Sequence, residues 1–530
     1  MTNARFISLV TRQATWLAVL VAMLGLALAL VRMDRNFFHV DEALYSSWGL
    51  RIARGDLLLT DQPVDKPPAF FYLQALGFRL FGVSEIVAKL PSLAAGVVVV
   101  LAVYDLCRRS YGAGTAVLAA ALVALNPYQI VYASSAFLDE AALAFAMGAC
   151  AVAARRRALA SGLALGLASC VKPQAGLYAP LVLWLLLVTG PSRARRAGTF
   201  LLGAGMTLGA AVAWSLARPG PPFWVLGQEH LPLHFVEPAS YASRAVAWWL
   251  DGVRWLVAHP LNQGLLVVAV LSSLATSAAW GARAVGRGLT HGAPFREAAK
   301  EATARPTASA GESVPAEGLD AGLALFVALY YLWHVVISFP VWDRYVVLLA
   351  PAGLALLARL LSRVASWLWG RSVDGAVGRA AGTAVVVVPL LVMALVARDT
   401  VLGRVGINGP GLGPNVPYES FQRAVNYLRA AAPDGAVVYD YLSFSWHYGY
   451  FLRDDRYPTL WFDLDHLPSA VDHMRGEDRP KFLILSWRMD GDPVLDRLRE
   501  AAVVPEAVYV VYSREGRPEV TVYRLWTQER

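Results

Sequence analysis

Long apolar windows recur along roughly the first 400 residues of this chain. Each holds about 17 to 23 residues, and a helix of that length crosses a hydrocarbon layer of roughly 30 Å. Because 57% of all residues are hydrophobic and only 16% are charged, a soluble core is not the natural interpretation. We predict eleven membrane spans, of which the third and fifth are short, near residues 14–33, 86–107, 113–126, 135–153, 158–171, 174–189, 197–217, 262–282, 320–339, 343–366 and 375–397.

Basic residues between the predicted spans indicate the orientation of the chain, because short cytoplasmic loops retain Lys and Arg during insertion. The clusters that fall on one side are Arg5 and Arg12; Arg108 and Arg109; Arg155 to Arg157; Arg193, Arg195 and Arg196; Arg283 to Arg305; and Arg363, Arg371 and Arg379. We therefore predict a multi-pass plasma-membrane protein with a cytoplasmic N-terminus and residues 398–530 outside. These loops largely account for the net charge of +8, so no nucleic-acid partner is expected.

The texture of the sequence changes after residue 398, where short β-rich runs alternate with helical stretches at 418–432, 466–475 and 492–500. The runs are GAVVYDY, KFLILS, AVYVVYS and VTVYRLW. This alternation predicts a small extracytoplasmic α/β domain at 398–530, which follows a polytopic α-helical membrane domain at 1–397. Within the membrane domain, residues 283–318 lack apolar periodicity and are expected to form a flexible cytoplasmic loop.

Two longer segments between predicted spans face the outer side. The outer loop 34–85 is predicted to hold two helices, one from Asp41 to near Gly55 and one from Pro67 to Gly82. The second helix is apolar nearly all round but too short to span, so we expect it to lie along the membrane interface. Residues 218–261 are first Pro-rich and then aromatic, which indicates a lid or an interface helix.

Unusual polar residues gather at or just beyond the outer ends of the predicted spans. They are Asp41, Glu42, Asp65, Lys66, Asp139, Glu140, Lys172, Asp343 and Arg344. Acids and bases that converge on one membrane face indicate a site open to both lipid and the outer water. In Asp65-Lys66-Pro67-Pro68, the prolines fix the backbone and hold a carboxylate and an ammonium together. Arg344 and Tyr345 suit a lipid phosphate, with Arg as a forked donor.

These polar residues also have a purely structural interpretation. Asp41 and Glu42 open a predicted helix, whose positive end stabilises any carboxylate. Asp139 begins a predicted span and is equally consistent with capping at the interface. Lys66 and Arg344 are long enough to reach headgroups from apolar surroundings, although Lys66 stands out because the chain has only five lysines against 42 arginines.

A divalent metal site is a weaker hypothesis. The predicted outer segments contain His39, His230, His234 and His447. Together with Asp41 and Asp65 they supply the right ligand types, but their spacing matches no ligand signature. The sequence has no phosphate-cradling glycine loop, no nucleophile elbow and no HExxH. A nucleotide-fuelled reaction is therefore not expected, and no cofactor is required.

The stretch HVDEALYSSWGLRIARGDLLLTDQPVDKPPAFFYLQALGFRLFGVSEIVAKLPSLAAG resembles the first outer loop and second span of the GT-C membrane glycosyltransferases. The relevant group includes the protein O-mannosyltransferases and lipid A aminoarabinose transferase. Its markers occur here in order: the acid pair Asp41 and Glu42 with Tyr45 shortly after, KPP with an aromatic run, and a Gly, acid, basic, Leu-Pro-Ser stretch. FLDEAALAF, VKPQAGLY and DRYVVLLAP fit the same group more weakly.

The resemblance implies an inverting transfer of a sugar from a polyprenyl-phosphate carrier to an acceptor hydroxyl on the outer face. Asp41 would be the general base that takes the proton of the acceptor. Asp139 would assist it or orient the acceptor. Lys66 and Arg344, with Tyr345, would hold the leaving lipid phosphate.

The remaining substrate contacts implied by the resemblance are Glu42, Tyr45, Asp65 and Lys172. The assignment of Lys172 as a substrate contact rests only on the proline that follows it. Asp65 stands where some relatives have Glu, and its shorter reach leaves any metal or sugar contact there open.

The implied partners are a polyprenyl-phosphate sugar donor, membrane lipids, and an acceptor that is a protein, a lipid or a glycan. A transporter or flippase of a lipid-linked saccharide is the main alternative, but its charges should lie nearer the bilayer midplane. A non-catalytic membrane subunit whose outer domain binds a partner is a third interpretation. The sequence indicates neither the sugar nor the acceptor.

Overall fold

The computed structural model describes residues 3–33, 39–60, 62–188, 192–230, 232–291, 314–340, 342–371, 375–405, 418–441, 450–452, 456–486, 492–512 and 516–527. The chain divides into two compact units. The membrane unit is Met1–Arg35, Leu58–Leu73 and Lys89–Gly409, and the sheet unit is Asn36–Leu57, Gln74–Ala88 and Pro410–Arg530. The sheet unit therefore takes in two stretches of the predicted outer loop 34–85. Most of the predicted flexible loop 283–318 lies outside the described residues.

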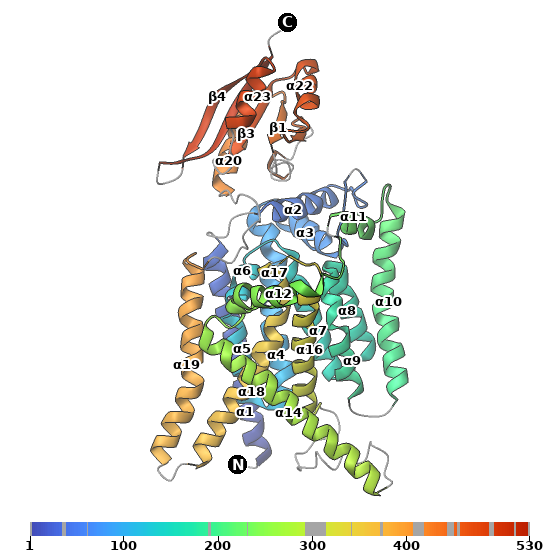
Figure 1. Cartoon of the computed structure of the whole chain (residues 1–530), viewed down its shortest axis with the longest axis vertical. Helices are drawn as coiled ribbons and strands as arrows, with labels where there is room; N and C mark the ends of the chain where they lie inside the picture. Colours follow the sequence, from blue (N-terminus) through green and yellow to red (C-terminus); the bar gives the residue numbers. More distant parts are fainter. Residues whose placement is uncertain are drawn as a thin grey trace. The chain divides into compact units, whose positions relative to one another are not determined.

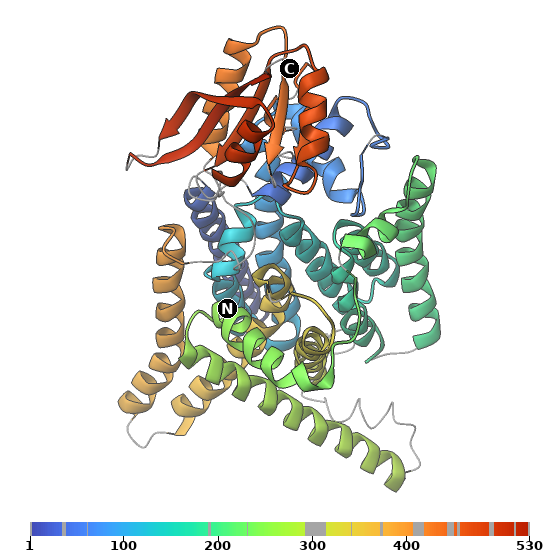
Figure 2. The same ribbon diagram turned by 45° about the horizontal axis from the view of Figure 1, so that its top comes forward.

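The long helices belong mainly to the membrane unit (Figure 1). They are α1 (Asn3–Met33), α4 (Glu85–Tyr111), α5 (Ala113–Ala124), α6 (Pro127–Ala133), α7 (Leu138–Ala154), α8 (Ala158–Val171), η1 (Pro173–Tyr178), α9 (Ala179–Leu187), α10 (Arg193–Ala217), α14 (Pro260–His291), α16 (Ala316–Val336), α17 (Asp343–Val346), η4 (Val347–Leu349), α18 (Ala350–Arg371) and α19 (Gly375–Val401). Each of the eleven predicted spans coincides with one of these helices or with a run of adjacent ones. The helix α14 runs obliquely to the other long helices (Figures 1 and 2).

Seven helices among the described residues are long and apolar enough to cross a membrane, and α5 with α6, bent by 60°, would make an eighth. The three other predicted spans are shorter: α7 has 17 residues, α8 has 14, and η1 with α9 covers Pro173–Leu187. The break after α8 has a local cause. Lys172 adopts an extended backbone (φ −145°, ψ 120°) immediately before Pro173, as residues that precede proline commonly do.

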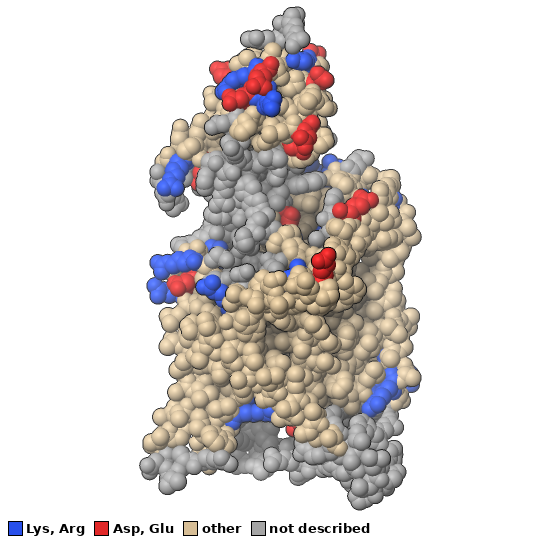
Figure 3. Space-filling model, in the orientation of Figure 1, with Lys and Arg blue, Asp and Glu red and all other residues tan. Residues whose placement is uncertain are grey.

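The surface of the membrane unit suits a lipid environment. Large apolar side chains are exposed along α1, α10, α14 and α19, for example Leu20, Leu201, Leu271 and Leu391. On the face shown in Figure 3, the described charged residues of this unit lie towards its two ends, with an uncharged belt between them. The protein is therefore a multi-pass membrane protein, as predicted.

Glycines let α8 and α10 pack with their backbones in contact. A Cβ added to Gly162 would come within 2.1 Å of the Phe200 carbonyl oxygen, and one added to Gly203 within 2.4 Å of the Leu159 carbonyl oxygen. Gly162 and Gly166 are spaced as in the small-residue motif that brings membrane helices together. This contact attaches α10, most of whose surface is exposed, to the rest of the unit.

Both of the predicted outer segments contain helices. The loop 34–85 holds α2 (Val40–Ala53) and α3 (Ala69–Phe81), close to the predicted bounds. The segment 218–261 holds α11 (Phe223–His230), η2 (Pro238–Ser240), α12 (Tyr241–Ala247), η3 (Trp248–Val253) and α13 (Arg254–Leu256).

The sheet unit contains the predicted α/β fold. Its elements are α20 (Tyr418–Ala431), β1 (Val437–Tyr441), β2 (Thr459–Phe462), α22 (Leu467–Gly476), β3 (Lys481–Ser486), α23 (Asp492–Glu500), β4 (Val503–Tyr512) and β5 (Pro518–Thr527). The strand order is β2-β1-β3-β5-β4, with β1 parallel to β2 and β3, and β5 antiparallel to β3 and β4. The strand β2 was not predicted, because its four residues carry no clear alternation.

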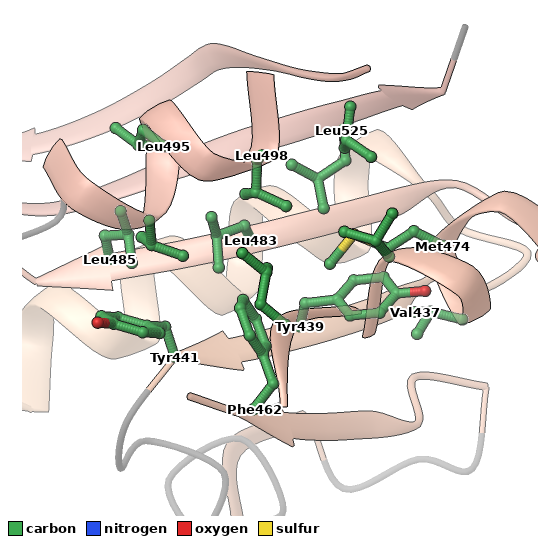
Figure 4. Packing of buried hydrophobic residues seen from close by; sticks show 14 residues of the cluster. Val437, Tyr439, Tyr441, Phe462, Met474, Leu483, Leu485, Leu495, Leu498 and Leu525 are labelled. Atoms are coloured by element: carbon green, nitrogen blue, oxygen red, sulfur yellow. The ribbon is translucent and has the colours of Figure 1, made fainter. Parts of the chain in front are cut away.

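The core of the sheet unit lies between the sheet and its helices. Tyr439 of β1 and Leu483 of β3 meet Met474 of α22 and Leu498 of α23 there, and Leu525 of β5 extends the same layer (Figure 4). This packing explains why the β-rich runs could be predicted, since one face of each strand supplies apolar side chains to the core.

Candidate functional site

Asp139 and Lys172 form a buried ion pair within the membrane unit. Asp139 lies in the first turn of α7, where the positive end of the helix favours a carboxylate. Lys172 lies in the break between α8 and η1. Their side chains are only 2% and 9% exposed, so water solvates neither charge well and each depends on the other for compensation. The break at Pro173 is what allows a lysine to lie between two apolar helices here.

Aromatic rings surround the cations beside this pair. The Lys172 Nζ lies 4.7 Å from the centroid of the Tyr345 ring. The Arg344 Cζ lies 4.4 Å from the ring of Trp342 and 5.6 Å from that of Tyr345. Tyr345 also forms side-chain hydrogen bonds with Arg344 and Gln174. Cation–π contacts of this kind hold positive charges in a poorly hydrated environment.

Lys66 contributes a third positive charge. Its ammonium pairs with Asp65, and both side chains are partly exposed. Burial lowers the pKa of Lys172 to about 8; Asp139 opposes this shift, and the positive charges of Arg344 and Lys66 add to it. Lys66, Lys172 and Arg344, which we call the cation cluster, therefore act on one another electrostatically. Such a cluster is suited to an anionic group such as a phosphate.

Asp41, Glu42 and Tyr45 lie on α2, in the sheet unit. The Asp41 backbone N–H donates to His39 Nδ1 (3.1 Å), and the His39 backbone N–H donates to Glu42 Oε2 (2.8 Å), so this start of α2 is a capping box. Asp41 is half-buried, whereas Glu42 and Tyr45 are buried. Glu42 thus has a structural role at the helix start, and its predicted substrate contact stays a prediction.

The hypothesis of a metal site receives no support from the described part of the chain. No group of three or more His, Cys, Asp or Glu side chains lies close enough there to hold an ion. His39 takes part in the α2 cap, and His234 is exposed. His447 and the side chain of His230 lie outside the described residues.

Sequence reasoning noted Glu140 but missed its partner. The Gln129 Nε2 donates to Glu140 Oε1 (2.5 Å) and to the Gly96 carbonyl oxygen (3.3 Å), and all three residues lie in the membrane unit. A Cβ on Gly96 would come within 3.2 Å of that Gln129 nitrogen. No sequence signal pairs these positions, because they lie on three different elements.

Comparison with known proteins points to one enzyme class. The family model for dolichyl-phosphate-mannose-protein mannosyltransferases matches residues 65–215, which include Lys66, Asp139 and Lys172. A Bacillus subtilis protein named "Putative mannosyltransferase YycA" is 28% identical over 164 residues, which are 29% of this chain. The match spans about a quarter (24%) of that relative.

Solved structures match nearly the whole chain. ArnT from Cupriavidus metallidurans, bound to undecaprenyl phosphate, is 16% identical with a TM-score of 0.57 and covers 95% of this chain and 97% of its own. The apo state of the same protein is 15% identical with a TM-score of 0.60, and the match covers 97% of this chain and 98% of that one. An oligosaccharyltransferase from Archaeoglobus fulgidus, in complex with Zn and sulfate, is 14% identical with a TM-score of 0.52. This match covers 95% of this chain and 72% of that one. The likeness to these structures confirms the predicted GT-C fold. The family-model match over residues 65–215 supports the predicted enzyme class, a glycosyltransferase.

Proposed function

We propose that the protein transfers a sugar from a polyprenyl-phosphate carrier to an acceptor hydroxyl at the outer face of the membrane. The observation that carries this proposal is the cation cluster around the buried Lys172–Asp139 pair. A donor whose phosphate stays at the membrane surface needs positive charges there, held in place before the lipid arrives. The ArnT structure with undecaprenyl phosphate supports this choice of carrier.

In the proposed reaction, the acceptor oxygen forms a bond to the anomeric carbon while the bond from that carbon to the phosphate oxygen breaks. The leaving lipid phosphate keeps the electron pair, so negative charge grows on it. Lys66 and Arg344 offset this charge, and Tyr345 donates a neutral hydrogen bond. Attack from the face opposite the phosphate gives inversion of the anomeric configuration.

Asp41 is the proposed general base, because the sequence resemblance to the GT-C glycosyltransferases implies that role. It accepts the proton that the acceptor hydroxyl loses during attack. Asp139 pairs with Lys172 in the structure, so we assign it first to holding that lysine; its predicted role toward the acceptor stays a prediction.

The proposed orientation follows the basic loops, with a cytoplasmic N-terminus and the sheet domain outside. The plasma membrane is the proposed location. Residues 398–530 would then be placed to bind a protein, lipid or glycan acceptor. Divalent-metal dependence is tested simply by adding a chelator to the transfer assay.

The test is transfer from a panel of radiolabelled polyprenyl-phosphate sugars, in membranes that carry the wild type or Asp41→Asn. We expect transfer by the wild type, a product of inverted configuration, and a loss of about 100-fold or more in the variant, as expected for removal of a general base. Glu506→Gln, an exposed acid of β4, serves as a control variant. No transfer from any donor by folded wild type would contradict the proposal and favour a flippase, which a lipid-translocation assay would detect.

A further inference from the structure

Arg244 of α12 is bonded to the backbone of another segment. Its Nε donates to the Val335 carbonyl oxygen (2.9 Å), and one terminal nitrogen contacts the carbonyl oxygens of His334 (2.9 Å), Ile337 (2.6 Å) and Phe339 (2.8 Å). These carbonyls belong to the end of α16 and the turn after it. The last carbonyls of a helix have no partner within the helix, so a guanidinium there both satisfies them and fixes the following turn.

The fixed turn leads directly to Arg344 and Tyr345. The Phe339 ring packs against the Tyr345 ring with centroids 5.2 Å apart. The Tyr330 hydroxyl, on α16, donates to the Tyr345 carbonyl oxygen (2.6 Å). The position of Tyr345, and with it the rings around Arg344, thus depends on the turn that Arg244 holds.

The same outer segment also pairs with this turn through its backbone. The Val236 N–H donates to the Val336 carbonyl oxygen (3.0 Å), and the Ser338 N–H donates to the His234 carbonyl oxygen (2.9 Å). The segment 218–261 is therefore fastened to the turn on both sides of its η2 helix. Such fastening disfavours the predicted alternative of a lid.

Arg218, directly after α10, donates hydrogen bonds to the backbone carbonyls of a second turn, as Arg244 does to those of the first. Its Nε donates to the Leu58 carbonyl oxygen (3.2 Å), and a terminal nitrogen contacts the carbonyl oxygens of Leu59 (3.2 Å) and Gln62 (2.5 Å). Its guanidinium lies 5.4 Å from the Trp214 ring. Lys66 follows Gln62 by four residues.

A glycine brings the outer segment close to the Lys66 turn as well. A Cβ added to Gly227 of α11 would lie 3.2 Å from the Asp65 carbonyl oxygen. The helix α11 therefore passes beside the backbone of Asp65, next to the lysine. Arg218 and Gly227 restrict the same turn from two positions along one segment.

We infer that Arg218 and Arg244 are positioning residues of the proposed transferase: each fixes the turn that carries one phosphate-binding cation, Lys66 and Arg344 respectively. The inference rests on the proposed function. Both arginines come from residues 218–244, so this one stretch presets the spacing of two cations before the lipid phosphate binds. Preset donors lose less conformational freedom when the lipid phosphate binds, which strengthens binding of the donor.

Lysine cannot replace these arginines. A guanidinium presents five N–H donors in a planar fork, whereas an ammonium has three donors around one point. Arg244→Lys and Arg218→Lys are therefore expected to behave like the corresponding Gln variants.

The experiment measures equilibrium binding of undecaprenyl phosphate to the full-length protein in detergent, together with donor KM, kcat and thermal unfolding. We expect Arg244→Gln and Arg218→Gln to weaken binding and raise KM about tenfold, with kcat changed less than about threefold, because ground-state placement of the phosphate is lost. Arg195→Gln, exposed at the opposite end of α10 from Arg218, is the matched control and should bind like the wild type.

Double variants separate positioning from general destabilisation. If Arg244 acts through Arg344, Arg244→Gln should weaken binding little further in a protein that already carries Arg344→Gln. The same should hold for Arg218→Gln with Lys66→Gln. The crossed pair, Arg218→Gln with Arg344→Gln, should show losses that add.

Additive losses in both matched pairs, rescue by lysine, or wild-type binding by the Gln variants would overturn the inference. A fall in binding that only tracks a fall in unfolding temperature would do so too. These outcomes leave the proposed function intact as long as the wild type binds the lipid and transfers sugar. Absence of both activities in folded wild type would overturn the function and the inference together.

Discussion

Lys172 and Asp139 are 33 positions apart in the sequence and form an ion pair with side chains 9% and 2% exposed. The pair joins the break after α8 to the first turn of α7. Breaking a buried pair leaves one charge without compensation, which costs far more than the loss of a surface pair.

We predict that Asp139→Asn lowers the free energy of unfolding by about 3 kcal/mol, because Lys172 stays buried without the carboxylate that compensates its charge. Removing both charges, in Asp139→Asn with Lys172→Met, should restore part of that loss. Thermal unfolding in detergent measures both. Equal destabilisation by Asp139→Asn and by the surface variant Asp496→Asn, whose carboxylate pairs with Arg499 in the open, would contradict the prediction.

The pH dependence of donor binding should report on Lys172. Its pKa is lowered to about 8, chiefly by burial, so it is charged below that pH and loses its charge as the pH rises through it. We therefore predict that affinity for the lipid phosphate falls as the pH rises above about 8, because one cation of the cluster is neutralised.

Lys172→Arg provides the matched comparison for this pH profile. Arginine stays protonated throughout the range, so the variant's affinity should stay level where that of the wild type falls. Identical pH profiles for the two proteins would show that another group causes the change.

Glu42 should matter for stability more than for chemistry. Its carboxylate accepts the His39 backbone N–H, so Glu42→Ala should destabilise the protein by about 1 kcal/mol. Glu42→Gln retains an acceptor oxygen and should cost less. A large loss of kcat in Glu42→Gln, with unchanged unfolding temperature, would instead indicate the substrate contact that the sequence resemblance implies.

The contact between α8 and α10 should tolerate no side chain at Gly162. An added Cβ would meet the Phe200 backbone at 2.1 Å, so Gly162→Ala should force the helices apart and lower the unfolding temperature. Gly205→Ala on α10 is the matched control, because an added Cβ there has nothing within 4 Å. The control should be neutral or more stable by up to about 1 kcal/mol, since alanine favours helices over glycine. Equal effects of the two substitutions would argue against backbone contact at Gly162.

Much of the fold follows from local sequence signals. Apolar windows predict the spans because backbone groups inside hydrocarbon must be paired within a helix. Strands β1, β3, β4 and β5 are visible as β-rich runs, whereas β2 is too short to show a period. The polar residues Lys66, Lys172 and Arg344 could be picked out because charges beside apolar spans are rare and costly.

The residues that hold these site residues in place could not be predicted from the sequence in the same way. Arg218 and Arg244 look like any of 42 arginines, and they bond to carbonyl oxygens, which every residue has. Glu140 of α7 and Gln129 of α6 come within hydrogen-bonding distance only when the helices pack, and the same Gln129 nitrogen then also reaches the Gly96 carbonyl oxygen of α4.

The sequence by itself thus determined where the chain is helical, where it leaves the apolar layer, and which charges sit at those exits. These depend on composition within one window, and the physical cost of a misplaced charge or an unpaired amide acts locally. Only the tertiary structure decided that Asp139 neutralises Lys172 and that the segment from Arg218 to Arg244 fixes two distant turns. Contacts between residues about 90 to 160 positions apart depend on how helices pack, and packing is set by the shapes of many side chains together.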